Sequence, residues 1–219
     1  MDTNNILLDV ANYYSQKLSE YGISAHGVDW NSEIGQEHRF AQLLKVIDLP
    51  DNFSVNDLGC GYGALFEYLT KRYGTFAYNG YDISEAMIEA SKSQFNCPEN
   101  TQFFISEYPR LIADFSVASG IFNVRLEHNQ KKWKDYIKTT LDALNKFSYR
   151  GFSFNCLTSY SDEHKKKDYL YYADPCEIFD HCKRMYSPNV SLLHDYGLYE
   201  FTIVVRKVDQ TIKGIANVT

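Results

Sequence analysis

The amino-acid sequence predicts an α/β fold in which helices cover both faces of a mostly parallel sheet. Short apolar runs alternate with amphipathic segments from residue 53 onward, a pattern typical of parallel β-α-β units. A glycine-rich turn directly follows the first apolar run, as in folds that bind ligands at the carboxyl ends of their strands. With 219 residues, the chain has the length of one domain.

The expected elements begin with two helices, over 6–21 and 37–47, because apolar residues recur there at helical spacing. The sequence then predicts strands over 53–58, 76–81, 101–105, 114–119 and 151–156, with helices over 64–72, 85–94 and 132–145. Two last strands, over 190–194 and 200–206, flank a short turn and should pair antiparallel. We therefore expect a helical cap over 1–50, which contributes to a cofactor pocket, and a core over 51–219.

Composition and charge exclude several classes of function. The formal net charge is −6 and the two basic runs, 131–134 and 165–167, are short, so we interpret both as solvated surface and nucleic acid as an improbable partner. Five cysteines without a C-x-x-C pair indicate reduced thiols rather than a zinc site. The N-terminus lacks a basic leader, and no apolar run approaches membrane-spanning length. These features favour a cytoplasmic protein that acts on a small molecule without a metal.

The motif that carries most chemistry is Asp57-Leu58-Gly59-Cys60-Gly61-Tyr62-Gly63. Glycines there allow a sharp turn and a close approach of a ligand to the backbone. Asp82 ends the next apolar run, 23 residues after Gly59, a position from which a carboxylate accepts hydrogen bonds from both ribose hydroxyls of a nucleoside.

Three interpretations of this motif remain open at this point: a nicotinamide or flavin enzyme, an S-adenosylmethionine enzyme, and a glycine turn without a cofactor. The G-x-G-x-G spacing favours S-adenosylmethionine, and so does Asp57, an anion placed near a ligand with a sulfonium and an ammonium. The helical preamble of about fifty residues and the closing hairpin point the same way.

The segments 57–63 and 80–91, DLGCGYG and GYDISEAMIEAS, resemble motifs I and II of the class I S-adenosylmethionine-dependent methyltransferases, and the resemblance covers about residues 30–207. It implies a Rossmann-like sheet of seven strands in the order 3-2-1-4-5-7-6, with strand seven antiparallel. The whole chain also resembles bacterial methyltransferases encoded among surface-polysaccharide genes. Two positions depart from the family pattern. Asn56 replaces a buried aliphatic residue, and 118–123 lacks the Asn-Pro-Pro-aromatic run of amino-methylating enzymes.

The resemblance also implies which residues hold the cofactor. Gly59 and Gly61 would face its methionine part, Asp82 its ribose hydroxyls, and Arg39 its carboxylate. Arg39 could instead be an exposed helical cation in an ion pair, and Trp30 could form a pocket wall or simply pack. The full set of expected cofactor-binding residues is Trp30, Arg39, Asp57, Gly59, Gly61, Asp82, Ile83, Met87, Ser106, Glu107, Ser119 and Gly120.

Methyl transfer needs mainly alignment, although a hydroxyl acceptor gains from a general base. His194, at the end of the sixth predicted strand, and His128, after the fourth, are the candidate catalytic residues, and the alternative for each is a surface histidine. The long polar segment 158–175 is either a substrate lid or an ordinary surface excursion. The expected substrate contacts are Tyr14, His26, Asn123 and Tyr172.

The sequence therefore predicts a methyltransferase that acts on a small polar acceptor, with a hydroxyl of a sugar or surface-glycan precursor as the first choice. One alternative keeps the cofactor but methylates a small carboxylate or amine. Another is a non-catalytic cofactor-binding or partner subunit. A monomer and a homodimer are both compatible with the sequence.

Overall fold

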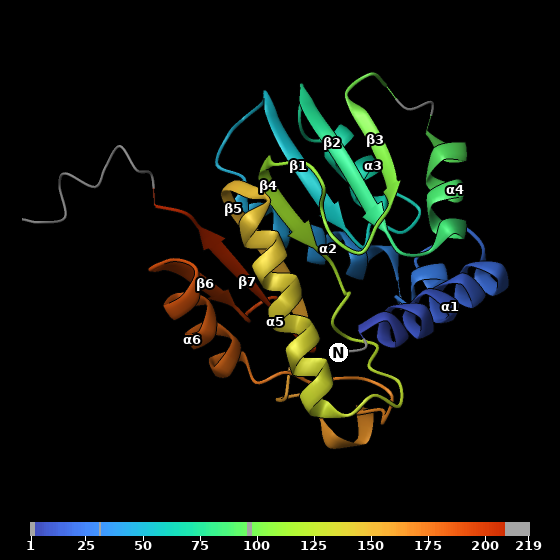
Figure 1. Cartoon of the computed structure of the whole chain (residues 1–219), viewed down its shortest axis with the longest axis vertical. Coiled ribbons are helices and arrows are strands. Elements are labelled where there is room, and N and C mark those ends of the chain that lie inside the picture. The colour runs from blue at the N-terminus through green and yellow to red at the C-terminus, as the bar shows by residue number, and fades with distance from the viewer. Residues whose placement is uncertain (1–2, 31, 96–97, 209–219) are drawn as a thin grey trace, which may run out of the picture.

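Seven strands form one sheet in the order β3-β2-β1-β4-β5-β7-β6, as expected (Figure 1). The computed structural model describes residues 3–30, 32–95 and 98–208. Cys97 and residues 209–219 of the predicted core lie outside these ranges. Strands β1 to β5 pair in parallel, and β7 runs antiparallel to both β5 and β6. The strands are β1 (Phe53–Leu58), β2 (Phe76–Asp82), β3 (Thr101–Ile105), β4 (Ala113–Ala118), β5 (Ser148–Leu157), β6 (Asn189–Leu193) and β7 (Glu200–Arg206).

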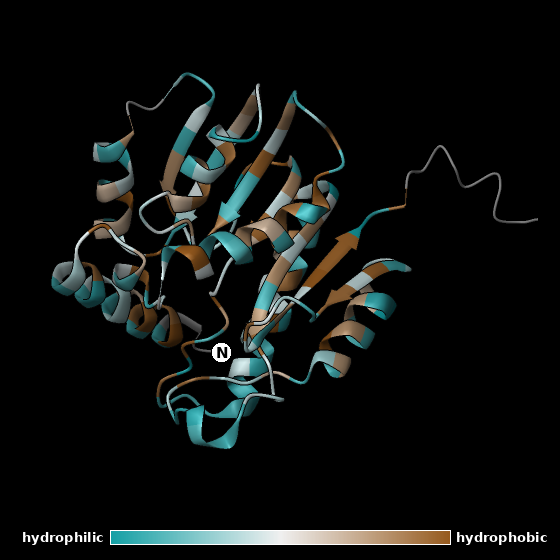
Figure 2. Ribbon diagram, turned by 180° about the vertical axis from the view of Figure 1, so that it is seen from behind, coloured by the Kyte–Doolittle hydropathy of each residue, from teal (hydrophilic) through white to brown (hydrophobic). Residues whose placement is uncertain are grey.

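Helices cover both faces of the sheet because the strand side chains alternate in direction. In β5, Phe152, Phe154 and Cys156 join one buried cluster with α1, α5 and α6, whereas Val204 of β7 joins a second cluster with α2, α3 and α4. Figure 2, which is coloured by hydropathy, shows that β7 consists mostly of hydrophobic residues. The helices are α1 (Thr3–Tyr21), α2 (Glu33–Leu43), α3 (Ala64–Thr70), α4 (Glu85–Gln94), α5 (Gln130–Lys146) and α6 (Pro175–Met185), with 3-10 turns η1 (His26–Val28), η2 (Leu44–Val46) and η3 (Glu163–Lys165).

Helix α1 positions the N-terminal part of the chain over the carboxyl ends of β1, β2 and β3 (Figure 1). Helix α2 begins at Glu33, four residues before the expected start at residue 37, because the Ser32 hydroxyl accepts the Gly35 N–H at 3.1 Å and caps the helix. Its last predicted residues form the 3-10 turn η2. Of the helices that the structure describes, none has the length and apolar character that crossing a membrane requires.

Helix α6 was not predicted, although its signal is present in the sequence. Asp174 caps the helix by accepting the N–H groups of Cys176 and Glu177, at 2.8 and 3.3 Å. Pro175 occupies the first helical position, where its missing N–H carries no cost. The Asp-Pro pair therefore ends the polar segment 158–175 and begins a helix that packs beside β6 and β7.

The unusual Asn56 joins three parts of the fold. Its Nδ2 donates to the carbonyl oxygens of Leu111 and Phe147, at 2.8 and 3.2 Å, and its Oδ1 accepts from Asn79 Nδ2 at 3.1 Å. The side chain is fully buried. Each of its polar atoms is therefore satisfied, which explains how strand β1 accommodates a buried amide at a position where the family resemblance implied an aliphatic residue.

We expect Asn56→Leu to lower the melting temperature by about 5 °C, because it leaves the buried Asn79 amide and two carbonyl groups without these partners, a loss of about 2 kcal/mol. Thermal unfolding followed by circular dichroism measures the change. Asn12→Leu, on the exposed side of α1, is the matched control. Equal melting temperatures for the two variants would contradict a structural role for the Asn56 hydrogen bonds.

Candidate functional site

A narrow cavity lies at the carboxyl ends of β1, β2 and β4, under the cap formed by α1 and the segment that leads into α2. Its volume is about 90 Å³. Of the twelve expected cofactor-binding residues, all except Arg39 line this first cavity. Residues that the sequence analysis did not select, and that complete the wall, include Leu7, Val10, Val28, Phe40, Tyr62 and Tyr136.

The glycine turn is shaped by close contacts. Gly59 adopts a positive φ of 75°, and its N–H donates to the Tyr81 carbonyl at 2.7 Å. A Cβ on Gly59 would lie 2.1 Å from Cγ2 of Ile121, so only glycine fits where the turn meets the loop after β4. The turn thus holds the backbone of β1 against that loop.

Asp82 is held by backbone donors at the end of β2. Its Oδ2 accepts the Gly61 N–H and its Oδ1 accepts the Ser84 N–H, both at 2.9 Å. Burial raises the pKa of this carboxyl, and backbone hydrogen bonds from Ser84, Gly61 and Ile83 oppose the rise. Asp82 lines the first cavity, and a carboxylate has more acceptor positions than these backbone donors occupy, so it can also accept from a ligand hydroxyl.

Asp57 lies in the same wall and is more deeply buried. Burial raises its pKa to about 7, while the hydroxyl of Tyr78, which donates to Oδ2 at 2.6 Å, opposes the rise. The nearby Asp82 carboxylate raises it further. Three carboxyl groups, those of Asp57, Asp82 and Glu107, therefore line one narrow cavity without a cation among its lining residues, which favours a ligand that carries positive charge.

The loop after β4 completes the cavity. The buried hydroxyl of Ser119 has no hydrogen-bond partner among the described residues and faces a cavity that a ligand could fill. The neighbouring Gly120 has a φ of 76°, and a Cβ there would lie 2.5 Å from the ring of Trp30. The indole of Trp30 is therefore packed directly on this loop.

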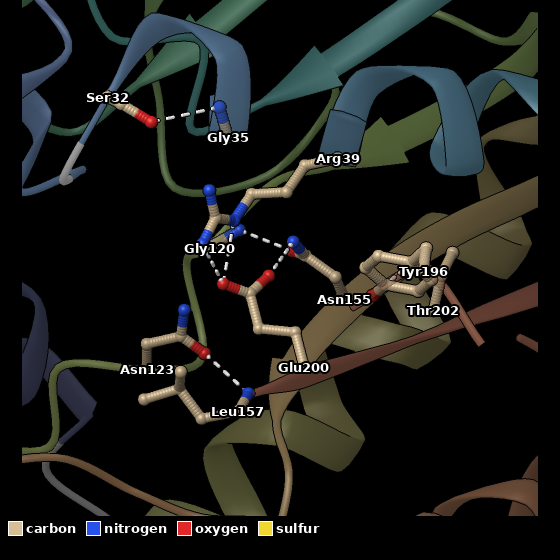
Figure 3. Close-up of polar contacts among 10 residues, drawn as sticks. All are labelled: Ser32, Gly35, Arg39, Gly120, Asn123, Asn155, Leu157, Tyr196, Glu200 and Thr202. Atoms are coloured by element: carbon tan, nitrogen blue, oxygen red, sulfur yellow. Dashed lines mark hydrogen bonds and ion pairs between the residues drawn. The ribbon is translucent and has the colours of Figure 1, made fainter. Parts of the chain in front are cut away.

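A buried polar network joins the cap to that loop (Figure 3). Nε of Arg39 donates to Glu200 Oε1 at 2.6 Å, and Asn155 Nδ2 donates to Glu200 Oε2 at 2.8 Å. Asn155 Oδ1 in turn accepts the Gly120 N–H at 2.7 Å. The guanidinium of Arg39 also stacks on Trp30, with Cζ 3.9 Å from the ring centroid. Arg39 is thus buried in an ion pair, and its predicted contact with the cofactor carboxylate stays a prediction.

A second, wider cavity of about 720 Å³ lies beside the first. Tyr14, Val28 and Trp30 line both cavities and form the boundary between them. Three of the four expected substrate contacts, Tyr14, Asn123 and Tyr172, lie in its wall. Residues that the sequence analysis did not select for it include Asp29, His164, Lys165, Lys166, Lys167, Leu198, Tyr199 and Glu200.

The remaining predicted residues lie elsewhere. His26 is exposed, and its Nδ1 lies 2.7 Å from the Trp30 carbonyl oxygen. His128 lies with Nε2 3.1 Å from an Asp9 carboxylate oxygen, and His194 is exposed at the end of β6. None of the three lines either cavity. A catalytic role for His128 or His194 stays a prediction. Within residues 3–30, 32–95 and 98–208, no group of three His, Cys, Asp or Glu side chains is placed to hold a metal ion.

The chain is similar to known methyltransferases in sequence. Residues 55–146 match the family described as "Methyltransferase domain". The chain is 56% identical over 164 residues to the "Putative methyltransferase Rv1506c" of Mycobacterium tuberculosis, in an alignment that covers 75% of this chain and 99% of that protein.

Solved structures share the fold at low identity. The complex of DhpI with SAH has a TM-score of 0.63 at 13% identity and covers 92% of this chain and 97% of its own. Magnesium protoporphyrin IX methyltransferase from Synechocystis PCC 6803, with bound SAM, has a TM-score of 0.55 at 14% identity, covering 80% and 81%. Human N-acetylserotonin methyltransferase has a TM-score of 0.58 at 16% identity, covering 92% and 66%.

The raised pKa of Asp57 predicts a pH dependence of binding in the first cavity. A positively charged ligand favours the ionised carboxyl, which is present above pH 7 and lost below it. We therefore expect the affinity for S-adenosylmethionine to rise about tenfold from pH 6 to pH 8, and that for S-adenosylhomocysteine, whose sulfur is neutral, to rise less. Isothermal titration calorimetry measures both.

The control is Asp57→Asn, which keeps an acceptor for the Tyr78 hydroxyl and cannot ionise. This variant should show similar pH profiles for the two ligands. Parallel profiles in the unaltered protein would contradict the role of the Asp57 charge.

Proposed function

The chain belongs to the class I S-adenosylmethionine-dependent methyltransferases, and we propose that it methylates a small polar acceptor held in the second cavity. A hydroxyl of a sugar or surface-glycan precursor is the favoured acceptor. The observation that carries the proposal is the boundary formed by Tyr14, Val28 and Trp30, which separates a narrow anionic cavity from a wide polar one.

We assign the first cavity to the methyl donor because its residues fit that molecule. The carboxylate of Asp82 offers acceptors for two ribose hydroxyls. Ile83 and Met87 provide an apolar wall for a flat base, and the unpartnered Ser119 hydroxyl is available to a polar group. Asp57 supplies the negative charge that a sulfonium and an ammonium require.

Methyl transfer from the first cavity to the second requires that the methyl group of the donor faces the boundary between them. When bound, the donor supplies a methyl carbon that its sulfonium activates, so that an acceptor oxygen bonds to this carbon as the carbon–sulfur bond breaks. The residues of the chain contribute alignment and exclusion of water. Trp30 and Tyr14, which line both cavities, would align the acceptor with the methyl group. The proton of an acceptor hydroxyl leaves to solvent or to a base.

Several features support a sugar-like acceptor. Tyr172 and Tyr199 give the second cavity aromatic surfaces with polar ends, and its volume of about 720 Å³ is in the range of small-molecule sites. We also assign residues 1–50 as a cap over both cavities and residues 158–175 as a lid on the second cavity. The lid segment contributes Ser161, His164 and Leu170, in addition to Tyr172, to the wall of the second cavity.

The test is a methyl-transfer assay with labelled S-adenosylmethionine against a panel of nucleotide sugars, sugar phosphates, small carboxylates and small amines. We expect turnover with a hydroxyl-bearing sugar derivative. Asp82→Ala should weaken donor binding at least tenfold, because the ribose hydroxyls lose their acceptors, whereas Asp195→Ala, in the exposed turn before β7, should not.

Methyl transfer only to carboxylates or amines would show that the protein is a methyltransferase but that the proposed hydroxyl acceptor is wrong. Tight binding of the donor without transfer to any member of the panel would favour a non-catalytic subunit. Unchanged donor affinity in Asp82→Ala would contradict the assignment of the first cavity.

A further inference from the structure

The segment between β5 and α6 brings a run of three lysines into the wall of the second cavity. Lys165, Lys166 and Lys167 all line this cavity, together with His164. The segment runs below the sheet near α1 (Figure 1), and its turn η3 is strongly hydrophilic (Figure 2). The sequence alone indicated a solvated surface for this run. Lys165 and Lys167 are indeed exposed, and all three lysines also line a concave site.

Hydrogen bonds within the segment, and one from the loop after β4, hold the backbone next to this run. The Lys167 N–H donates to the Tyr172 hydroxyl at 3.0 Å, and the Leu170 N–H donates to the Lys167 carbonyl at 3.0 Å. From the loop after β4, Arg125 Nη2 donates to the Asp168 carbonyl at 2.8 Å. The lysines are therefore presented by a hydrogen-bonded strap and not by an unattached loop.

The charges in this wall do not balance. Four cations, Arg39 and the three lysines, face two anions, Asp29 and Glu200. The buried pair of Arg39 with Glu200 cancels within itself. Asp29 already accepts from the Tyr13 hydroxyl at 2.7 Å and lies 3.2 Å from Lys17 Nζ. The carboxylates of Asp162 and Glu163 pair with Lys165 and Lys166 but do not line the cavity, so its lysine end is lined by cations, in a chain whose net charge is −6.

The existing partners of these lysines can be exchanged for a ligand. Lys166 pairs with Glu163, whose side chain is 87% exposed. Lys165 donates to the Tyr199 hydroxyl at 2.8 Å and lies 3.7 Å from Asp162, with both charged side chains about half exposed. Exposed pairs of this kind contribute about 0–1 kcal/mol. Lys167 contacts the Tyr169 hydroxyl at 3.2 Å and forms no ion pair with the described carboxylates.

We propose that the second cavity recognises its acceptor through a phosphate group, as a phosphate ester or diphosphate, which binds at the end formed by Lys165, Lys166 and Lys167. Lysine ammonium groups bind phosphate as point charges. The inference rests on the proposed function in one respect, namely that the reacting hydroxyl lies at the other end, beside Tyr14 and Trp30. Recognition at one end would then hold the hydroxyl at the boundary between the cavities.

The test is isothermal titration calorimetry with S-adenosylhomocysteine present and three probes: glucose, glucose 6-phosphate and UDP-glucose. The variant replaces all three residues, Lys165→Gln, Lys166→Gln and Lys167→Gln. The matched control removes the same charge from the exposed side of α5, with Lys131→Gln, Lys132→Gln and Lys138→Gln. We expect at least one phosphorylated probe to bind, more weakly in higher salt, and to lose at least tenfold in affinity in the first variant only.

Binding of glucose as tight as that of the phosphorylated probes would overturn the proposal. So would equal effects of the two triple variants, or no binding of either phosphorylated probe to the unaltered protein. An unchanged affinity for S-adenosylhomocysteine shows that each variant is folded with an intact first cavity. Failure of the proposed function would look different, because phosphate-dependent binding would persist while methyl transfer was absent.

Discussion

The buried ion pair between Arg39 and Glu200 is the contact on which the arrangement of both cavities depends. Burial of two charges is unfavourable unless nearly every donor and acceptor is satisfied. Here the Glu200 carboxylate accepts from Arg39 and Asn155, and Asn155 accepts the Gly120 N–H. Arg39 also stacks on Trp30. Residues from α2, β5, β7 and the loop after β4 are therefore fixed relative to one another, although they lie far apart in the sequence.

This network gives the proposed function its geometry. Trp30 packs on Gly120 on one side and on Arg39 on the other, so the boundary between the two cavities is held by charge and by shape together. Displacement of a methyl group demands alignment within a fraction of an ångström. A boundary between an anionic cavity and a basic one suits that demand, because the proposed cationic donor and the proposed anionic acceptor would each be attracted to a different side of it.

Much of the fold could be predicted from local patterns in the sequence. The strands over 53–58, 101–105 and 200–206 and the helix over 85–94 match the structure residue for residue, because buried apolar runs and Ser84 as a cap are local signals. Eleven residues of the first cavity were predicted, from the glycine turn, from Asp82 and from the family resemblance. The rest depends on contacts between distant residues. No spacing in the sequence indicates that Arg39 meets Glu200, or that Lys165 to Lys167 face a cavity, because tertiary packing alone decides both.

The most direct test of this account is a crystal structure of the protein with S-adenosylhomocysteine bound. The account predicts that its ribose hydroxyls contact Asp82 and that its sulfur faces the boundary formed by Tyr14, Val28 and Trp30, with the second cavity open on the other side. Electron density for the ligand in the second cavity, or a sulfur directed away from that boundary, would contradict the division of the site into donor and acceptor cavities.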